Sequence, residues 1–384
     1  MSRRVAVTIA AISPIVLALV GACGGPEQPE AAGGDGPIAV RASDTECQVA
    51  RTEADAGVIT FEVANRGNRV TEFYLYAEGD RIMGEVENIG PGLTRRLIVE
   101  VAEGGSYTTA CKPGMSGDGI RGEFTVNGDA AAAADGNARL AEATASYQRY
   151  VNSQCDALIA RTTEFVAAVK AGEVDRAKSL FPVARVYWER IEPVAESFGD
   201  IDPKIDGRED VIDEGMEFTG FHRLEKDLWV SGLQPDSAEI ADRLLADVTD
   251  LVGRAKELEL TPLQLANGAK ELLDEVATGK ITGEEDRYSH TDLWDFRSNV
   301  DGSKAAITSL RPVLVERDPA LVSTLDERFG AVESLLETHR RGDGFKLYTE
   351  LTEGEIKQLA AAVDALAEPL SAVAGVVAEA GATK

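Results

Sequence analysis

The sequence predicts a small all-β sandwich followed by an all-α helical bundle. Hydrophobic residues alternate with polar ones between about residues 38 and 127, whereas after residue 137 they recur at helical spacing. An alanine-rich, low-complexity stretch at 129–136 separates the two patterns and is typical of an interdomain linker. A chain of 384 residues is long enough for both parts to bury a core of their own. We therefore expect two domains, at residues 37–128 and 137–384.

The first 36 residues have the pattern of an export signal and a tether. Two arginines precede an uncharged apolar run at 5–20, which matches the basic and apolar regions of a secretory signal. The run ends in VGAC at 20–23, which resembles the lipobox of bacterial lipoproteins. We expect cleavage of residues 1–22, lipid attachment to Cys23 and a flexible tether over 23–36, so that the protein is anchored outside the cytoplasmic membrane. An ordinary signal peptide or an uncleaved anchor is the alternative.

The sequence pattern divides each part into individual strands or helices. In the β part, alternating runs predict strands at 59–63, 97–101 and 124–126. Turn-forming sequences divide these runs at intervals typical of a small sandwich; they lie at 65–67, 78–80, 90–92 and 103–105. In the helical part, a first amphipathic stretch ends at Gly172. Further helices are predicted at about 175–198, 209–231, 236–257, 262–278, 291–315, 319–340 and 353–380.

The chain is strongly acidic. It has 66 Asp and Glu residues against 39 Lys and Arg residues, for a formal net charge of −27 at pH 7. This balance argues against a nucleic-acid partner, because affinity for phosphate backbones comes largely from Lys and Arg. An acidic surface raises the local concentration of cations, which is by itself a weak indication of metal handling.

Two cysteines, Cys47 and Cys111, fall in the predicted sandwich. In a compartment outside the cytoplasm such a pair forms a disulfide by default. The alternative is a metal site, because Cys111 and Met115 lie on a loop before the last strand, where a thiolate and a thioether hold copper in cupredoxins. Cys155, in the first predicted helix, is expected to be a buried free thiol.

A metal site in the sandwich would have an unusual set of ligands. All three histidines of the chain lie beyond residue 200, so a blue-copper site with two histidines is excluded. A metal ion would have to bind the two cysteines, Met115 and carboxylates. We expect Glu72 to be the carboxylate, because it lies within an apolar strand and a buried glutamate needs a partner. The alternative is that Glu72 points to solvent.

The helical part contains three pairs of possible metal ligands at i, i+3 spacing, which places both side chains of a pair on one face of a helix. The pairs are Glu189 with Glu192, His222 with Glu225, and Asp292 with Asp295. Facing pairs of this kind resemble the carboxylate and Glu-x-x-His arrangements by which helical bundles hold iron. The alternative is a buried salt-bridge network, in which the carboxylates are neutralised by Arg185, Arg190 and Lys226.

A zinc peptidase is the natural enzyme hypothesis for such a helix, but the spacing does not fit. The HExxH and HxxEH motifs supply two histidines from one helix, whereas the sequence from His222 is HRLEK. One nitrogen and several oxygens suit iron, or another hard to borderline cation, better than catalytic zinc. We therefore do not expect an enzyme.

Several long motifs resemble the EfeO family. They are ENIGPG at 87–92, YWERIEPVAESFGDID at 187–202, IDGRED at 205–210, TGFHRLEKDLW at 219–229 and GEEDRYSHTDLWDFRSNVDGS at 283–303. This family comprises the extracytoplasmic iron-binding component of EfeUOB iron uptake systems. Its helical half is an imelysin-like domain, also called peptidase M75, marked by GxHxxE. The resemblance covers nearly everything after the tether.

The resemblance implies a cupredoxin-like domain fused to an imelysin-like domain, each with a metal site. The helical site would bind iron and draw on Glu189, Glu192, His222, Glu225 and Asp292. The cupredoxin-like site would bind copper or iron and draw on Cys47, Glu72 and Cys111. The implied partners are an EfeU-type membrane permease and an EfeB-type haem peroxidase. Two departures from the family are the lipobox, since many members are soluble in a periplasm, and Met115, which leaves copper or iron open at the second site.

The function that we expect from the sequence is capture of extracytoplasmic iron by a lipid-anchored protein that delivers it to a permease. One alternative is an imelysin-type metallopeptidase, in which Glu225 would be essential for cleavage of peptides. Another is a lipoprotein that binds an envelope polysaccharide. The negative charge stands against the latter, because it repels a polyanion.

Overall fold

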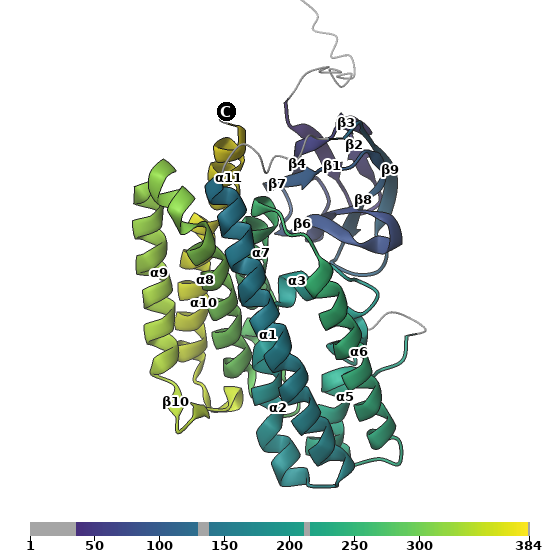
Figure 1. The fold of residues 1–384 in the computed structure, drawn as a ribbon, viewed down its shortest axis with the longest axis vertical. Helices are drawn as coiled ribbons and strands as arrows, with labels where there is room; N and C mark the ends of the chain where they lie inside the picture. Colours follow the sequence, from purple (N-terminus) through teal and green to yellow (C-terminus); the bar gives the residue numbers. More distant parts are fainter. Residues whose placement is uncertain (1–35, 130–137, 211–215, 383–384) are drawn as a thin grey trace, which may run out of the picture. The chain divides into compact units, whose positions relative to one another are not determined.

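The computed structural model describes residues 36–129, 138–210 and 216–382 (Figure 1). The predicted signal peptide, Cys23 with its predicted lipid, and the tether up to residue 35 lie outside the described residues. The same holds for residues 130–136 of the predicted linker.

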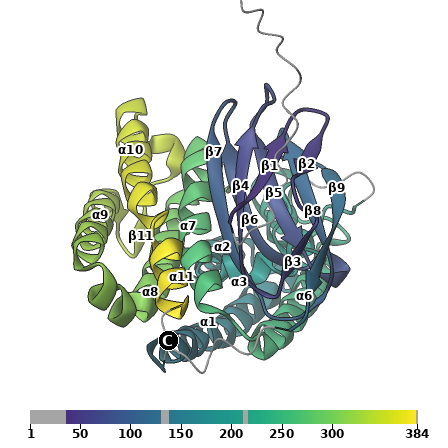
Figure 2. The ribbon, with the colours of Figure 1, turned by 90° about the horizontal axis from the view of Figure 1, so that it is seen from above.

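Residues 38–127 form two β-sheets, and the predicted all-β sandwich is confirmed (Figure 2). One sheet has the strand order β2-β1-β4-β7 and the other has β3-β9-β8-β5-β6. The pairs β1 with β4 and β3 with β9 are parallel, and the others are antiparallel. The strands are β1 (Ile38–Ala42), β2 (Cys47–Val49), β3 (Glu53–Asp55), β4 (Gly57–Asn65), β5 (Thr71–Tyr76), β6 (Ile82–Ile89), β7 (Thr94–Val101), β8 (Gly105–Pro113) and β9 (Ile120–Asn127), with the short η1 (Glu78–Asp80) before β6.

Aromatic side chains connect the two sheets in the core of the sandwich. Phe61 on β4 is buried, and its ring centroid lies 5.1 Å from that of Phe73 and 5.3 Å from that of Phe124. Phe73 and Phe124 belong to the other sheet. Aromatic pairs at such distances contribute about 0.5–1.5 kcal/mol beyond the burial of their area. These contacts therefore stabilise the packing of one sheet on the other.

The structure pairs Cys47 with Cys111 in a disulfide. Cys47 lies on β2 and Cys111 on β8, so the bond links the two sheets, with Cα atoms 5.6 Å apart. The prediction that these cysteines bind a metal ion is corrected, because a sulfur bonded to another sulfur is not a thiolate ligand. The bond closes a separation of 64 residues. A disulfide of this kind typically contributes about 2–4 kcal/mol to stability.

The second part of the chain is helical, as its period predicts. Helix α1 packs against α2, α6 and α8, and α7 packs against α8 and α10 (Figures 1 and 2). The helices are α1 (Ala138–Lys170), α2 (Val174–Glu189), α3 (Glu192–Glu196), α4 (Asp202–Ile205), α5 (Gly220–Lys226), η3 (Asp227–Ser231), α6 (Ser237–Glu257), α7 (Pro262–Thr278), η4 (Lys280–Thr282), α8 (Asp292–Arg317), α9 (Pro319–Glu337), η5 (Tyr348–Glu350), α10 (Glu353–Leu370) and α11 (Val373–Ala382). A small hairpin of β10 (Arg340–Arg341) and β11 (Gly344–Phe345) lies between α9 and η5.

The stretch from Glu353 to Ala382 is apolar and long enough to cross a membrane by length and composition. Core helices of soluble proteins, which are mostly buried, pass the same test, whereas 28% of the most apolar part of this stretch is buried. In this structure Leu359, Val363 and Leu366 of α10 are buried, and α10 packs against α7 and α9. The stretch therefore contributes to the core of the bundle.

One predicted helix divides in two where candidate ligands lie. The stretch predicted at 175–198 breaks after Glu189, and a new helix begins at Glu192. Pro193 explains the break, because proline has no backbone N–H and is favoured in the first turn of a helix. The premise that Glu189 and Glu192 share one helix is therefore wrong, although both side chains still reach the same buried lysine, Lys280.

Of the helix predicted at 209–231, residues 211–215 lie outside the described residues, and residues 209–210 and 216–219 are not helical. Its helical conformation begins at Gly220, which has a φ of +79°. A Cβ atom there would lie 2.2 Å from the carbonyl oxygen of Ile205, so this close approach of two chain segments requires glycine. The approach brings the loop after α4 against the start of α5, two residues before His222.

Candidate metal centre

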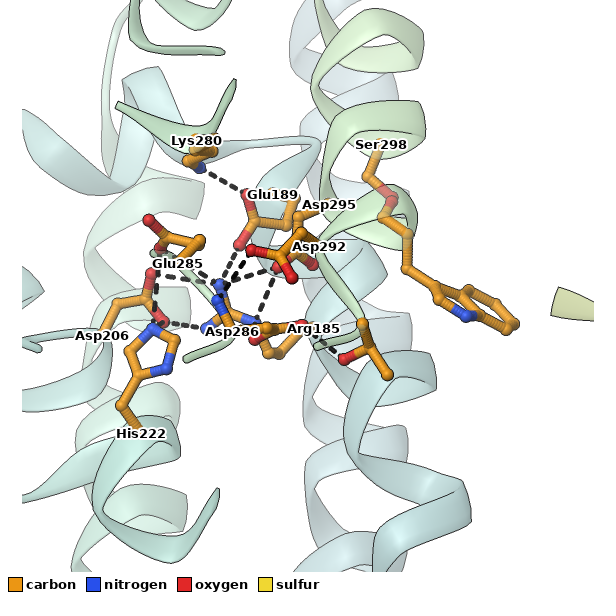
Figure 3. A network of polar contacts seen from close by, with 12 residues as sticks. Arg185, Glu189, Asp206, His222, Lys280, Glu285, Asp286, Asp292, Asp295 and Ser298 are labelled. Atoms are coloured by element: carbon orange, nitrogen blue, oxygen red, sulfur yellow. Dashed lines mark hydrogen bonds and ion pairs between the residues drawn. The ribbon is translucent and has the colours of Figure 1, made fainter. Parts of the chain in front are cut away.

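A cluster of buried ionisable side chains lies where several segments of the helical part meet (Figure 3). The segments are the end of α2, the start of α3, the residue after α4, helix α5, the loop from η4 to α8, and the start of α8. The buried or nearly buried members are Arg185, Glu189, Glu192, Asp206, His222, Glu225, Lys280, Glu285, Asp286, Asp292 and Asp295. Eight of these eleven are carboxylic acids, so the cluster needs cations for its stability.

Helix α5 carries the histidine and glutamate of the HxxE motif on one face. His222 Nδ1 lies 3.0 Å from Glu225 Oε2. Glu225 Oε1 accepts hydrogen bonds from the backbone N–H groups of Tyr288 and Ser289, at 2.9 and 2.7 Å. Both oxygens of Glu225 are therefore engaged, and the carboxylate fixes the orientation of the imidazole.

The other nitrogen of the histidine faces two further carboxylates. His222 Nε2 lies 3.5 Å from Asp206 Oδ1 and 3.5 Å from Glu285 Oε1, and it makes no hydrogen bond. Figure 3 shows the ring directed toward Asp206 and Glu285. A buried imidazole nitrogen that has ion-pair contacts but no hydrogen bond can be satisfied by a bound ion. Asp206 and Glu285 were not predicted as ligands, although they lie in the motifs IDGRED at 205–210 and GEEDRYSHTDLWDFRSNVDGS at 283–303.

Arg185 lies in the middle of the cluster and is completely buried. Its guanidinium forms ion pairs with five carboxylates, from Glu189, Asp206, Glu285, Asp286 and Asp295. The salt-bridge alternative is thus correct in part, since Arg185 does neutralise candidate ligands. Of the other two cations named in that alternative, Arg190 pairs with Asp301 and Lys226 with Glu209.

A second buried cation, Lys280, was missed by the sequence reasoning. Its ammonium lies 2.7 Å from Glu189 Oε2 and 2.8 Å from both carboxylate oxygens of Glu192. Lys280 lies in a short Gly-Lys-Ile-Thr-Gly turn after α7, a context that gives no sign of burial. Glu189 and Glu192 therefore bind internal cations in this structure.

Three aspartates at and before the start of α8 keep oxygens without hydrogen bonds. Asp292 Oδ1 accepts from the backbone N–H of Asp286, but Asp292 Oδ2, Asp286 Oδ1 and Asp295 Oδ1 have no hydrogen-bond partner. Native structures contain few buried polar atoms of this kind, so several in one place indicate a site for a ligand. Asp292 is the only one of the three predicted as a ligand.

Three groups of side chains in the described residues have ligand atoms close enough together to hold one ion. Within each group the atoms lie within 4.8 Å of one another. The groups are Asp206, His222 and Glu285; His222, Glu225 and Asp286; and Glu189, Glu192 and Asp206. One imidazole and several carboxylates form a donor set that suits iron or another hard to borderline cation. All five residues predicted for the helical site lie in this cluster, together with others that were not predicted.

The pKa values of several ionisable groups in and beside the cluster are raised, so these groups hold their protons more tightly. Burial and Arg185 lower the pKa of His222, but Asp206, Glu225 and Glu285 outweigh them and raise it to about 10. Burial raises the pKa of Asp292 to about 7 and that of Asp202, beside the cluster, to about 8. Without an ion, His222 is therefore an imidazolium at neutral pH, and an incoming metal cation would replace its proton.

These shifts predict that the metal-free protein becomes less stable as the pH rises from 6 to 9. A group whose pKa is higher in the folded than in the unfolded state stabilises the fold below its unfolded value, and this contribution is lost as the pH rises through the folded value. For His222 that window runs from about 6.5 to about 10. We expect the contribution of His222 to the free energy of unfolding to fall by roughly 3 kcal/mol between pH 6 and pH 9, measured as the difference between the wild type and His222→Gln in urea titrations in a chelator.

The variant His222→Gln is the control for this pH effect, because it cannot be protonated. Its free energy of unfolding should depend less on pH over the same interval. An unchanged slope in this variant, or a wild-type protein as stable at pH 9 as at pH 6, would contradict the assignment.

A small cavity adjoins the histidine. It has a volume of about 10 Å³ and is lined by side chains that include His222, Glu225 and Glu285. Its rim carries Arg208, which pairs with Glu285 at 3.2 Å, and Arg287, which pairs with Asp210 at 2.5 Å. The cavity therefore touches the histidine, and two salt bridges lie among its lining residues.

The predicted site in the sandwich is not assembled in the same way. Glu72 is 5 % exposed, so the alternative that it points to solvent is wrong. Its Oε2 accepts a hydrogen bond of 3.0 Å from the hydroxyl of Tyr74, and burial raises its pKa. Met115 is 41 % exposed, and both cysteines are used in the disulfide. None of the three potential metal-binding groups in the described residues contains a residue of the sandwich.

Comparison with known proteins agrees with this architecture. The cupredoxin-like domain profile matches residues 15–126, and the imelysin profile, of peptidase family M75, matches residues 143–373. The iron uptake system components EfeO of Escherichia coli O157:H7 and of Shigella flexneri are each 37% identical to this chain over 346 residues, which cover 88% of this chain and 91% of the relative. A putative iron-regulated protein A precursor from Parabacteroides distasonis aligns with a TM-score of 0.48 and 17% identity over 63% of this chain and 95% of that chain, which is too distant to add support.

The fold and the buried cluster thus define a cupredoxin-like domain joined to an imelysin domain. At this identity and coverage, the chain belongs to the EfeO family of iron uptake system components.

Proposed function

We propose that this protein captures an iron ion outside the cytoplasmic membrane and delivers it to a membrane permease. The observation that carries the proposal is the buried His222 Nε2, which has no hydrogen-bond partner and lies 3.5 Å from two carboxylates. The iron uptake relatives support iron as the cargo. The proposal also includes lipid attachment at Cys23. It further includes an EfeB-type haem peroxidase as a partner.

We assign the ion to His222 Nε2, Asp206 and Glu285. Glu225 would hold the imidazole from its other nitrogen, as carboxylates behind metal-binding histidines commonly do. Asp292 Oδ2, which has no hydrogen-bond partner, and Asp286 Oδ1, which pairs with Arg185 at 3.4 Å, lie in the same cluster and could complete the ligand set. This assignment differs from the sequence prediction, because Glu189 and Glu192 are engaged by Lys280.

Capture and release follow from the charges of these ligands. The ion would replace the proton of His222 and compete with Arg185 for Asp206, so binding is coupled to proton release. Acidification returns the proton and weakens the site. Docking of a partner that moves the salt bridges at the rim of the cavity would weaken it as well.

The peptidase alternative receives no support from the geometry. A catalytic zinc centre of the HExxH type needs two imidazoles, whereas each potential metal-binding group in the described part of the chain has at most one. The family name, peptidase M75, does not change this count.

The proposal can be tested by uptake of radioactive iron into cells that lack the gene and carry a plasmid copy of it. The wild-type gene should restore uptake, and a gene encoding His222→Ala should not, although the variant protein is present in equal amount outside the cytoplasm. Full uptake with the variant would overturn the proposed site. Uptake that never depends on the gene would overturn the proposed function.

A further inference from the structure

Lys280 occupies an unusual place for a lysine. The residue is completely buried, and its ammonium contacts three carboxylate oxygens of Glu189 and Glu192 at 2.7 to 2.8 Å, with Glu275 Oε1 at 3.6 Å. Removing an ammonium from water costs several kcal/mol unless close partners compensate for it. The carboxylates around Lys280 therefore form a cation-binding site. In this structure the cation is the ammonium of Lys280 itself.

The two glutamates that bind Lys280 also belong to a possible metal site. One oxygen from each of Glu189, Glu192 and Asp206 lies within 4.8 Å of the others. Asn299 on α8 is completely buried, and its Nδ2 donates to Glu189 Oε2 at 3.1 Å and to Glu192 Oε2 at 2.8 Å. The amide oxygen of Asn299 has no hydrogen-bond partner. The Asn299 amide thus turns its NH2 group toward these carboxylates, and the carboxylate oxygens are the typical ligands of hard cations here.

This second place adjoins the proposed iron site through a shared residue. Asp206 belongs both to the group with His222 and Glu285 and to the group with Glu189 and Glu192. In helical bundles, carboxylates from neighbouring helices commonly hold two metal ions side by side. The arrangement here has the carboxylates for two cations.

We propose that the ammonium of Lys280 takes the position of a second metal ion, so that the cluster binds one metal ion and not two. The inference rests on the proposed function, which supplies the first ion at His222. Lys280 would thereby determine the stoichiometry of the site. A site with one exchangeable ion and one fixed charge suits a carrier, because release then requires the loss of the bonds to a single ion.

The test compares Lys280→Met, which keeps the length of the side chain but not its charge, with Lys280→Arg, which keeps the charge. Mn²⁺ is the probe, and equilibrium dialysis of the full chain gives the number of ions bound per molecule. We expect one ion for the wild type and for Lys280→Arg, and two for Lys280→Met. Electron paramagnetic resonance should show a magnetically coupled Mn²⁺ pair only in Lys280→Met.

The methionine variant has two buried carboxylates without their ammonium, so its folding must be followed as well. Circular dichroism should show that Mn²⁺ stabilises Lys280→Met more than the wild type, because the added ion replaces the lost charge. A folded Lys280→Met that binds no more ions than the wild type overturns the inference. A variant that stays unfolded in saturating Mn²⁺ also overturns it, because a metal ion would then be unable to replace the ammonium.

The same experiment separates this inference from the proposed function. A wild type that binds no ion contradicts the proposed iron site. If Lys280→Met then still gains one ion over the wild type, the assignment of Lys280 stands without it.

Discussion

Changing His222 to alanine and Glu225 to glutamine in one protein is expected to weaken iron binding by at least about 100-fold. The first change removes the nitrogen ligand, and the second removes the carboxylate that orients it from 3.0 Å. Glu225→Gln alone should weaken binding by about 10- to 100-fold, because residues behind a ligand typically have effects of that size. The affinity can be measured by competition with a chromogenic chelator under anaerobic conditions.

The chain offers a matched control for the double variant. His339 is buried, and its Nδ1 lies 3.7 Å from Glu355 Oε1, outside the cluster. The variant with His339→Ala and Glu355→Gln should bind iron as the wild type does. Equal losses in both double variants would indicate damage to the fold in place of loss of a ligand.

The second large effect is expected at Arg185. Replacing this buried arginine with methionine should lower the free energy of unfolding of the metal-free protein by about 3–5 kcal/mol. The reason is that the carboxylates of Glu189, Asp206 and Asp295 would lose the cation between them. Urea titration at pH 7 in a chelator measures the change. Part of the loss should be recovered at lower pH, where the carboxylates can bind protons.

The control for this variant is Arg161→Met. Arg161 forms an ion pair of 3.0 Å with Glu164, but both side chains are more than two fifths exposed. Such pairs contribute less than about 1 kcal/mol. A change at Arg185 no larger than that at Arg161 would show that Arg185 is not the counter-ion of the cluster.

The fold could be predicted from sequence because each part has one dominant period. The alternation of Ile59, Phe61 and Val63 predicted the buried face of β4. The helical spacing after residue 137 predicted the bundle. The divisions within helices were harder to foresee. The break before Glu192 and the late start of α5 at Gly220 depend on contacts with segments distant in the sequence, which local spacing does not contain.

The candidate site could be predicted only in part for a similar reason. The spaced pairs drew attention to His222, Glu225, Glu189 and Glu192, and the structure brings all of them into one cluster. Asp206 and Glu285 lie in quoted motifs but among several other charged residues, and Lys280 lies in a short turn, so local spacing does not single out any of them. Their roles arise from the meeting of α2, α5 and the loop before α8. For the two cysteines the sequence left a disulfide or a metal open, and only the distance between the strands decided it.

We expect iron to bind at the buried histidine of the helical part, His222. Anomalous diffraction at the iron edge, from crystals of the iron-loaded protein, tests it most directly. We predict one strong peak within about 2 to 2.5 Å of His222 Nε2 and of oxygens from Asp206 and Glu285. A strong peak in the sandwich with none beside His222, or no peak in a protein that is shown to carry iron into cells, would contradict it.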